Sequence, residues 1–462
     1  MMDWRIALRG VTRNKRRSIF TVMTLAVGAI AILLFGAFIG FLYLSFQTSA
    51  VQNSGHLQIF QKGFGDYGAA DPLKYSIANY VQLMGDLRAD PVMGPMIATI
   101  TPTQTIFGIA SNPDTGNTKT FYGSGMVRED HYRQELWNEY KLPLKFVGKP
   151  IKDADIETGD IGIGLARLLR ICNGLKVPGC QAQKTADIAA LDAASPFKDL
   201  LDQQPGDRAQ AKNQRPNRID LLAPTTAGAP NVISMYAVSA SKMDSKSSND
   251  SAVYIGLPLA QRLIYGRRAP AVSNIIIQLK STSQLEAAEA RMQTLIKTRN
   301  LNLEILNFMQ LVPLYGQALK FLGTIFVFIA IIIGMIVLFS VINTMSMSVM
   351  ERTTEIGTMR SLGASRAEIT AQFVIEGLIL GLLGSTIGDG LAWLISVAVN
   401  AADLKWTPPT SIDQQPLKLM LGNFPSLLIY TCLALTLLAT VASVWPARRA
   451  SRMEVGDALR HV

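Results

Sequence analysis

The chain is poor in charge, cysteine and histidine, and each shortage excludes a class of protein. Only 17% of its 462 residues are charged, against about 25% in an average soluble domain, so a wholly soluble protein is not expected. Its three histidines and three cysteines are too few and too scattered for a zinc site, which takes about four ligands. We therefore expect neither a metal site nor a catalytic cluster.

The excess of positive charge has two possible meanings. A net charge of +10 is compatible with nucleic-acid binding and also with the basic flanks of membrane helices. The Lys and Arg residues gather beside long apolar runs. We therefore expect contact with membrane lipid and no nucleic-acid partner.

Four apolar runs are long enough to cross a bilayer, which takes about 20 residues. We predict transmembrane spans at 18–46, 318–349, 367–399 and 424–445. The first follows basic residues, as a signal peptide does, but its apolar run is about twice as long as the roughly 7–15 residues of such a peptide. We interpret it as an uncleaved anchor.

The positions of Lys and Arg predict the orientation of these spans. With four spans, every basic cluster falls on one side of the membrane: Arg5, Arg9, Arg13, Lys15, Arg16, Arg17, Arg352, Arg360, Arg366, Arg448, Arg449, Arg452 and Arg460. Since cytoplasmic loops carry the excess of basic residues, we expect both termini in the cytoplasm. Residues 47–317 and a short loop at 400–423 then lie outside.

The two ends of the chain are predicted to lie at the cytoplasmic surface. Residues 1–17 place Trp4, Leu8 and Val11 on one helical face, which indicates an amphipathic helix lying on the membrane. The alternative is a solvated basic lead-in to the first span. Residues 446–462 are predicted to form a cytoplasmic tail.

The segment 47–317 mixes strand-like and helix-like runs, at 56–61, 80–88, 118–122, 163–171, 253–255, 257–265, 273–279 and 283–298. This mixture predicts a large α+β domain. Residues 181–230 are polar and rich in Gln, Asp, Ala and Pro, so we predict a weakly ordered insertion there.

Two cysteines flank a turn-rich loop in this domain. Outside the cytoplasm, an oxidising compartment permits a disulfide between Cys172 and Cys180, and the alternative is two reduced thiols. A bridge across so short a loop adds only about 2–3 kcal/mol. Cys432 stands in an apolar run, where a packing or lipid-facing role is expected.

The segment 350–366, between the second and third spans, carries the most informative pattern. Its apolar residues recur at helical spacing and predict a short amphipathic helix: Ile356, Met359 and Leu362. Gly363 suits the position just past a helix end, and Ser365 with Glu368 forms a capping-box pattern that opens the next helix. By physics alone, a helix shaped to fit a partner and an ordinary interhelical loop remain equal alternatives.

This segment resembles the signature E-R-T-x-E-I-G-x-x-K/R-x-L-G-A of the MacB/FtsX/LolC superfamily of ABC permeases. The residues at 446–460 resemble the family's ending, with Gly456 where Pro is usual. The N-terminal residues and two weaker motifs, at 162–169 and 257–264, are similar as well.

The resemblance implies a coupling helix that docks on an ATPase. Its residues in this chain are Glu351, Arg352, Thr353, Glu355, Ile356, Gly357, Met359, Arg360, Leu362, Gly363 and Ala364. It also implies two ABC ATPase subunits that bind ATP and Mg, and a second permease copy in a homodimer or related heterodimer. Because the chain has no Gly-x-x-x-x-Gly-Lys-Ser/Thr loop, we expect a non-catalytic subunit without a cofactor of its own.

The resemblance further implies a bacterial inner-membrane protein with a MacB-like periplasmic domain at 47–317. Its movement would be driven by the ATPase cycle, a mechanism called mechanotransmission. We expect a complex that extracts lipoproteins or lipids and delivers them to a periplasmic carrier. The alternatives are a tripartite efflux pump with an adaptor protein and an FtsX-like regulator of a cell-wall hydrolase.

Two carboxylates fall inside the predicted third span. A charge inside a membrane is costly, so an ionisable residue there is a candidate functional residue by default. The two carboxylates are Glu376 and Asp389. The alternatives are that Glu376 pairs with a basic residue and that Asp389 lies at the outer headgroups. Four glycines of this span are spaced for close helix packing: Gly377, Gly381, Gly384 and Gly388.

Overall fold

The computed structural model describes residues 15–68, 73–143, 155–172, 174–175, 177–180, 216–243, 245–407 and 414–453. Most of the helix predicted at 1–17 lies outside these ranges, as does the part of the predicted insertion at 181–215. The described chain divides into two units. One holds the long apolar helices, and the other, β-rich unit comprises Phe46–Tyr315 with Thr407–Gln415.

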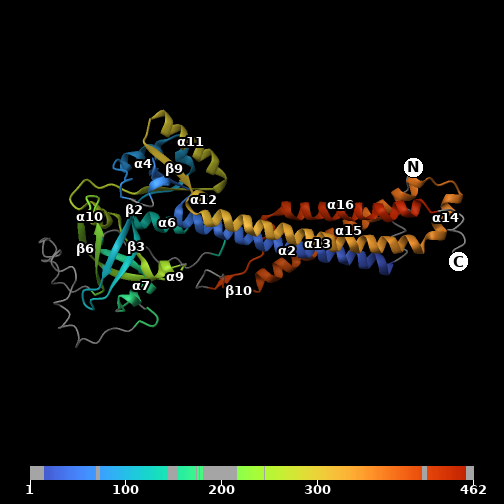
Figure 1. Ribbon diagram of the computed structural model, residues 1–462, viewed down its shortest axis with the longest axis horizontal. Helices are drawn as coiled ribbons and strands as arrows, with labels where there is room; N and C mark the ends of the chain where they lie inside the picture. The colour runs from blue at the N-terminus through green and yellow to red at the C-terminus, as the bar shows by residue number, and fades with distance from the viewer. Residues whose placement is uncertain are drawn as a thin grey trace. The chain divides into compact units, whose positions relative to one another are not determined.

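Four described helices are long and apolar enough to cross a membrane, and they lie side by side in Figure 1. They are α2 (Lys15–Ser54), α13 (Pro313–Glu351), α15 (Arg366–Ala401) and α16 (Pro425–Ser451). At 1.5 Å per residue, α2 is about 60 Å long, twice the apolar thickness of a bilayer. This helix continues beyond residue 46, where the sequence predicted the end of the membrane span.

The glycines of α15 allow two other helices to approach it closely. A Cβ atom built on Gly377 would lie 1.9 Å from Ser443 Oγ of α16. One built on Gly388 would lie 2.6 Å from Ala29 Cβ of α2. In lipid there is no hydrophobic drive between helices, so this close van der Waals contact is a main source of their association.

Short elements connect the last three of these helices. Helix α14 (Thr353–Ser361) joins α13 to α15. Between α15 and α16 lie β10 (Lys405–Trp406), β11 (Gln415–Pro416) and the 3-10 turn η4 (Leu421–Asn423).

Helix α16 continues to Ser451 with Pro446 inside it, so the first residues of the predicted tail at 446–462 are helical, and the cytoplasmic location of the tail stays a prediction. A proline within a helix removes a hydrogen bond and strains the preceding turn. Here Ala447 and Ala450 are buried against α14 and α15, and this packing offsets the cost.

Nine strands form the sheet of the β-rich unit: β1 (Leu57–Gln61), β2 (Ile97–Ser111), β3 (Thr118–Met126), β4 (Thr158–Gly162), β5 (Arg218–Pro224), β6 (Pro230–Ser241), β7 (Ala252–Gly256), β8 (Asn274–Leu279) and β9 (Leu303–Asn307). Their order is β3-β7-β4-β6-β5-β2-β8-β1-β9, and β3 also pairs with β2. This second pairing closes six strands, from β3 round to β2, into a ring. Strand β2 is long enough to serve both the ring and the extension through β8, β1 and β9.

Among the described residues, ten short helices accompany the sheet: α3 (Phe64–Tyr67), α4 (Tyr80–Ala89), α5 (Met93–Met96), α6 (Arg128–Glu135), α7 (Ile163–Leu168), α9 (Lys246–Ser251), α10 (Leu257–Tyr265), η3 (Thr282–Gln284), α11 (Leu285–Thr298) and α12 (Phe308–Leu311). The expected fold class is thus confirmed in its architecture, with four long apolar helices and an α+β domain between the first two.

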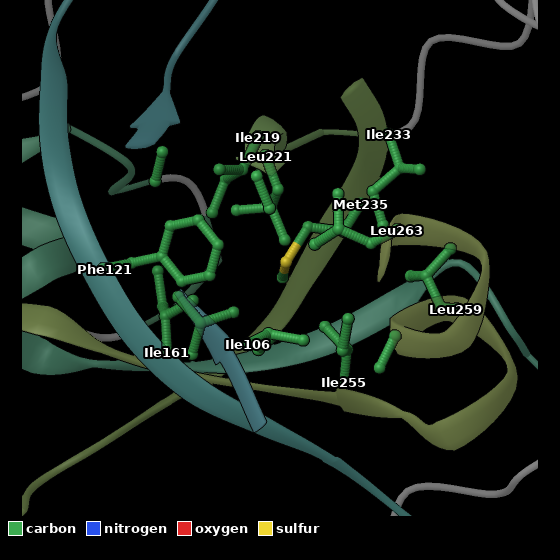
Figure 2. Close-up of a cluster of buried hydrophobic side chains, with 14 of the residues drawn as sticks. Ile106, Phe121, Ile161, Ile219, Leu221, Ile233, Met235, Ile255, Leu259 and Leu263 are labelled. Atoms are coloured by element: carbon green, nitrogen blue, oxygen red, sulfur yellow. The ribbon is translucent and has the colours of Figure 1, made fainter. Parts of the chain in front are cut away.

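The core of the ring is apolar, as Figure 2 shows. Alternate residues of the strands point inward, and α10 adds Leu259 and Leu263. Full burial of one such side chain contributes about 1.5–3 kcal/mol. Strand β5 supplies Ile219 and Leu221 to this core, so the end of the predicted insertion at 181–230 is wrong. The polar composition of that region concealed a short alternating strand.

The structure joins Cys172 and Cys180 in a disulfide, with 5.7 Å between their Cα atoms. The bridge follows α7, whose Leu165 and Ala166 are buried in the ring core. The third cysteine, Cys432, is free, and its Sγ lies 3.3 Å from Ser385 Oγ of α15. It is therefore a packing residue between α15 and α16.

A buried histidine lies just after α2 ends. The Leu279 N–H donates to His56 Nδ1 at 3.0 Å, so the ring proton is on Nε2, which donates to Thr282 Oγ1 at 3.1 Å. Trp137 and Phe308 meet the ring edge-on. Burial lowers the pKa of His56 to about 4, and the neutral ring is the form that the fold holds.

We predict that acid destabilises the β-rich unit through His56. Since the pKa falls from 6.5 to about 4 on folding, the unfolded chain binds the additional proton between these values. Stability is full above pH 6.5 and falls as the pH drops towards 4, by about 3 kcal/mol at most. Thermal unfolding of the full chain in detergent, followed from pH 7.5 to 4, measures this. A His56→Gln variant should be less stable at neutral pH with a shallower acid dependence, and an equally steep dependence would contradict the assignment.

We also predict that Gly388→Leu disrupts the helical unit and Gly390→Leu does not. A Cβ at Gly388 would collide with α2, whereas one at Gly390 would have nothing within 4 Å. Yield and melting temperature of the two purified variants test this. Equal behaviour would show that α2 does not pack against this face of α15.

Candidate functional site

The backbone of the segment between α13 and α15 is held by hydrogen bonds after α14 and at the start of α15. After α14, the Gly363 N–H donates to the Arg360 carbonyl at 3.1 Å and the Ala364 N–H to the Met359 carbonyl at 3.0 Å. These two bonds form a Schellman motif, and Gly363 has the positive φ of 98° that the motif requires. Ser365 and Glu368 then form a capping box that begins α15.

One face of α14 is buried against the ends of the long helices. Thr353, Ile356 and Gly357 are buried, and Ile356 is only 1% exposed. Ile356 belongs to a cluster with residues of α13, α15 and α16: Val349, Ile369, Phe373, Ala447 and Ala450. The position of α14 therefore depends on all three of these helices.

Arginine side chains join this segment to its neighbours. Arg17 of α2 pairs with Glu351 at the end of α13. Arg352 Nη1 lies 3.1 Å from Glu376 Oε2 of α15. The contact to α16 is made by Arg360, whose Nη1 donates to the Ser451 carbonyl at 2.8 Å.

The opposite face of α14 is exposed. Thr354, Thr358 and Ser361 point away from the helices. Two large apolar residues flank them, Met350 at 74% and Leu362 at 83% exposed. The expectation that Ile356, Met359 and Leu362 share one apolar face is therefore wrong. Steps of three residues drift by about 60° around a helix with 3.6 residues per turn, so two steps carry Leu362 away from the buried side.

Seven of the eleven residues predicted for coupling thus fall into two sets. Those that hold α14 in place are Arg352, Thr353, Ile356, Gly357 and Arg360, and those that shape its outer end are Leu362 and Gly363. Sequence reasoning missed the contacts that decide this division, made by Arg17, Phe373 and Ser451. Each lies far along the chain from its partner.

The two predicted intramembrane carboxylates have different surroundings. Glu376 is buried and paired with Arg352, as in the alternative that it pairs with a basic residue. Asp389 follows Gly388, and its Oδ1 is buried with no hydrogen-bond partner in the described part of the chain. Its location at the outer headgroups stays a prediction. Within the same described residues, no group of three or more His, Cys, Asp or Glu could hold a metal ion.

Residues 325–455, which include α14, match the family described as FtsX-like permease C-terminal. This part of the chain is an FtsX-like permease domain. Curated relatives that match the chain are themselves ABC transporter components. The macrolide export ATP-binding/permease protein MacB of Burkholderia lata is 27% identical over 212 residues, which cover 45% of this chain and 28% of MacB.

Two proteins of Bacillus subtilis match as well. The permease YtrF is 38% identical over 142 residues, covering 30% of this chain and 32% of YtrF. The permease YknZ is 27% identical over 197 residues, covering 41% of this chain and 45% of YknZ. The aligned region thus spans less than half of each relative. The resemblance to MacB/FtsX-type permeases stated from the sequence is confirmed.

Two solved domains were also found. The periplasmic region of MacB from Actinobacillus actinomycetemcomitans aligns at 13% identity with a TM-score of 0.28, covering 56% of this chain and 93% of that one. The extracellular domain of YknZ aligns at 10% identity with a TM-score of 0.29, covering 55% and 99%. Scores this low establish no shared fold, so the fold of the β-rich unit rests on its own strand pairings.

We predict that Gly363→Ala loosens the end of α14, while Gly363→Asn does so less. A residue with a Cβ at positive φ costs about 1–2 kcal/mol, and Asn tolerates it better. Hydrogen exchange at the Gly363 and Ala364 amides, which close the Schellman motif, reports this local opening. Unchanged exchange in the alanine variant would be incompatible with the motif.

Proposed function

We propose that this chain is the permease subunit of an ABC transporter, and that it couples ATP hydrolysis by a separate cytoplasmic ATPase to movement of its β-rich domain. The observation that carries the proposal is α14, a short helix held rigidly on one face and bare on the other. A helix built in this way offers a partner a fixed surface. The FtsX-like family match covers this helix.

The distribution of charge supports a cytoplasmic location for α14. The contacts of Arg17 with Glu351 and of Arg360 with Ser451 bring the start of α2 and the ends of α13 and α16 to the same end of the bundle. The described members of the basic clusters, such as Arg17, Arg352 and Arg448, lie at this end, which the positive-inside rule would assign to the cytoplasm. The β-rich unit is inserted between the other ends of α2 and α13, and so would lie outside.

The disulfide fits this orientation, because such bonds persist in oxidising compartments such as the periplasm. The proposed location is therefore the bacterial inner membrane, with a large periplasmic domain. ATP and Mg would be bound by two copies of the ATPase, and this chain would supply no cofactor site.

A second permease copy is the other proposed partner. Helix α13 leaves large apolar side chains uncovered within the described chain, among them Phe321, Phe328 and Phe339 at 64–67% exposed. In a membrane these side chains would face lipid or the second copy. A homodimer or a related heterodimer would place two α14 helices against two ATPases.

The proposed cargo is amphiphilic, such as a lipoprotein or lipid taken up at the outer face of the inner membrane and passed to a periplasmic carrier. The names of the MacB relatives, which describe macrolide export, favour a second candidate. In that case the chain would act in an efflux assembly with a periplasmic adaptor. Proteins and lipids recovered with the complex would separate the two.

We predict that a separate ABC ATPase co-purifies with the detergent-solubilised chain and is lost when the outer face of α14 is changed. The variant combines Thr358→Arg with Leu362→Asp. Its recovery of ATPase should fall at least about tenfold, which corresponds to about 1.4 kcal/mol of binding free energy. Mass spectrometry of the co-purified proteins gives the amounts.

The matched control is Leu404→Asp. Leu404 is also an exposed leucine, at 51%, but it lies in the loop after α15, at the other end of the bundle. The control should retain the ATPase at the wild-type level. An ATPase that is absent from all three preparations, or equally present in all three, would contradict the proposal.

A further inference from the structure

An ion pair lies buried where α13 meets α14. The Arg352 side chain is 9% and the Glu376 side chain 6% exposed, and their Nη1 and Oε2 atoms are 3.1 Å apart. Arg352 stands at the junction between α13 and α14, whereas Glu376 lies within α15. Two helices are thus joined by opposite charges that are largely shielded from water.

The Arg352 guanidinium has further contacts in both directions. Its Nε lies 3.3 Å from Glu355 Oε2, one turn into α14. Its central carbon lies 5.8 Å from the ring centre of Phe373, in the turn of α15 before Glu376. One side chain therefore bridges α14 and α15. Separating the helices would leave a buried charge without its partner, which is far more costly than breaking a surface pair.

Glu376 is placed where α15 is fixed to α16. The next residue is Gly377, on which a Cβ would lie 1.9 Å from Ser443 Oγ. The backbone of α15 cannot move towards α16 at this point. A displacement of Glu376 towards α16 would therefore move α15 and α16 together.

We propose that the Arg352–Glu376 ion pair transmits movement of α14 to α15 and α16 without touching the ATPase. Arg352 is then a positioning residue, although it belongs to the segment that docks. The inference rests on the proposed function. It divides the segment into an outer surface that binds the ATPase and an inner ion pair that passes the displacement on.

The test is an Arg352→Gln, Glu376→Gln double variant. Two amide side chains can still hydrogen-bond to each other, and no unpaired charge remains between these two positions, so the helices should fold together. The matched control neutralises an exposed pair at the other end of the bundle, Asp403→Asn with Lys418→Gln, whose charged atoms are 3.3 Å apart. Glu376→Gln alone is the second variant, with Arg352 still held by Glu355.

Two quantities are measured on the purified complex of each chain with its co-purified ATPase. The first is the amount of ATPase recovered per permease. The second is the change in hydrogen exchange on addition of ATP and Mg, over α14, over the first turns of α15 and over the last turns of α16. A merely structural role would alter exchange without nucleotide, but would not remove the nucleotide-dependent part selectively.

Wild type and control should show the nucleotide-dependent change in all three helices. The double variant and Glu376→Gln should recover the ATPase normally and keep the change in α14, but lose it in α15 and α16. The inference is overturned if these variants keep the change in α15 and α16. It is also overturned if they lose the ATPase, since Arg352 would then belong to the docking surface. A wild-type chain that recruits no ATPase overturns the proposed function, and this inference with it.

Discussion

The close approach of α15 to α2 and α16 is the contact on which the helical unit depends. In lipid, apolar side chains gain nothing from meeting one another in place of acyl chains. Gly377 and Gly388 allow backbones to meet where any side chain would collide. This approach brings the ends of the helices together, so that Arg17 of α2, Arg352 between α13 and α14, and Arg360 of α14 reach partners on neighbouring helices.

The segment between α13 and α15 lies at that end, and it combines a fixed inner face with an exposed outer face. Its backbone is fixed by the Schellman motif at Gly363 and the capping box at Ser365, and its inner face is anchored by Ile356. Its outer face carries small hydroxyl residues and the bare Leu362. Exposed apolar side chains at a rigid turn are costly to hold in water and gain energy when a partner covers them, which is why this geometry suits docking.

The β-rich unit depends on the closure of part of its sheet into a ring. A sheet with open edges exposes unpaired backbone groups, and here the pairing of β3 with both β2 and β7 closes six strands around one apolar core. Long strand β2 then continues into the extension formed by β8, β1 and β9. The strands and helices expected from local patterns are present, but β2, β4, β5, β6 and β9 were not among them, and β5 shows why. Its alternation of Ile219 and Leu221 is too short to stand out in polar surroundings, and the pairing with β2 and β6 makes it a strand.

Local patterns in the sequence by themselves determined the four spans, the family resemblance, the α+β character of the domain, the end of α14 and the start of α15. Each of these depends on residues close together in the chain, such as an apolar run, a glycine after a helix or a Ser and Glu three residues apart. Tertiary structure alone decided which way Arg352 and Leu362 point, that Glu376 is paired, and that six strands close into a ring. These features join residues from 24 to more than 300 positions apart, and no local period encodes such a distance. Pro446 shows the same limit, because only the packing of Ala447 and Ala450 allows the helix to continue through it.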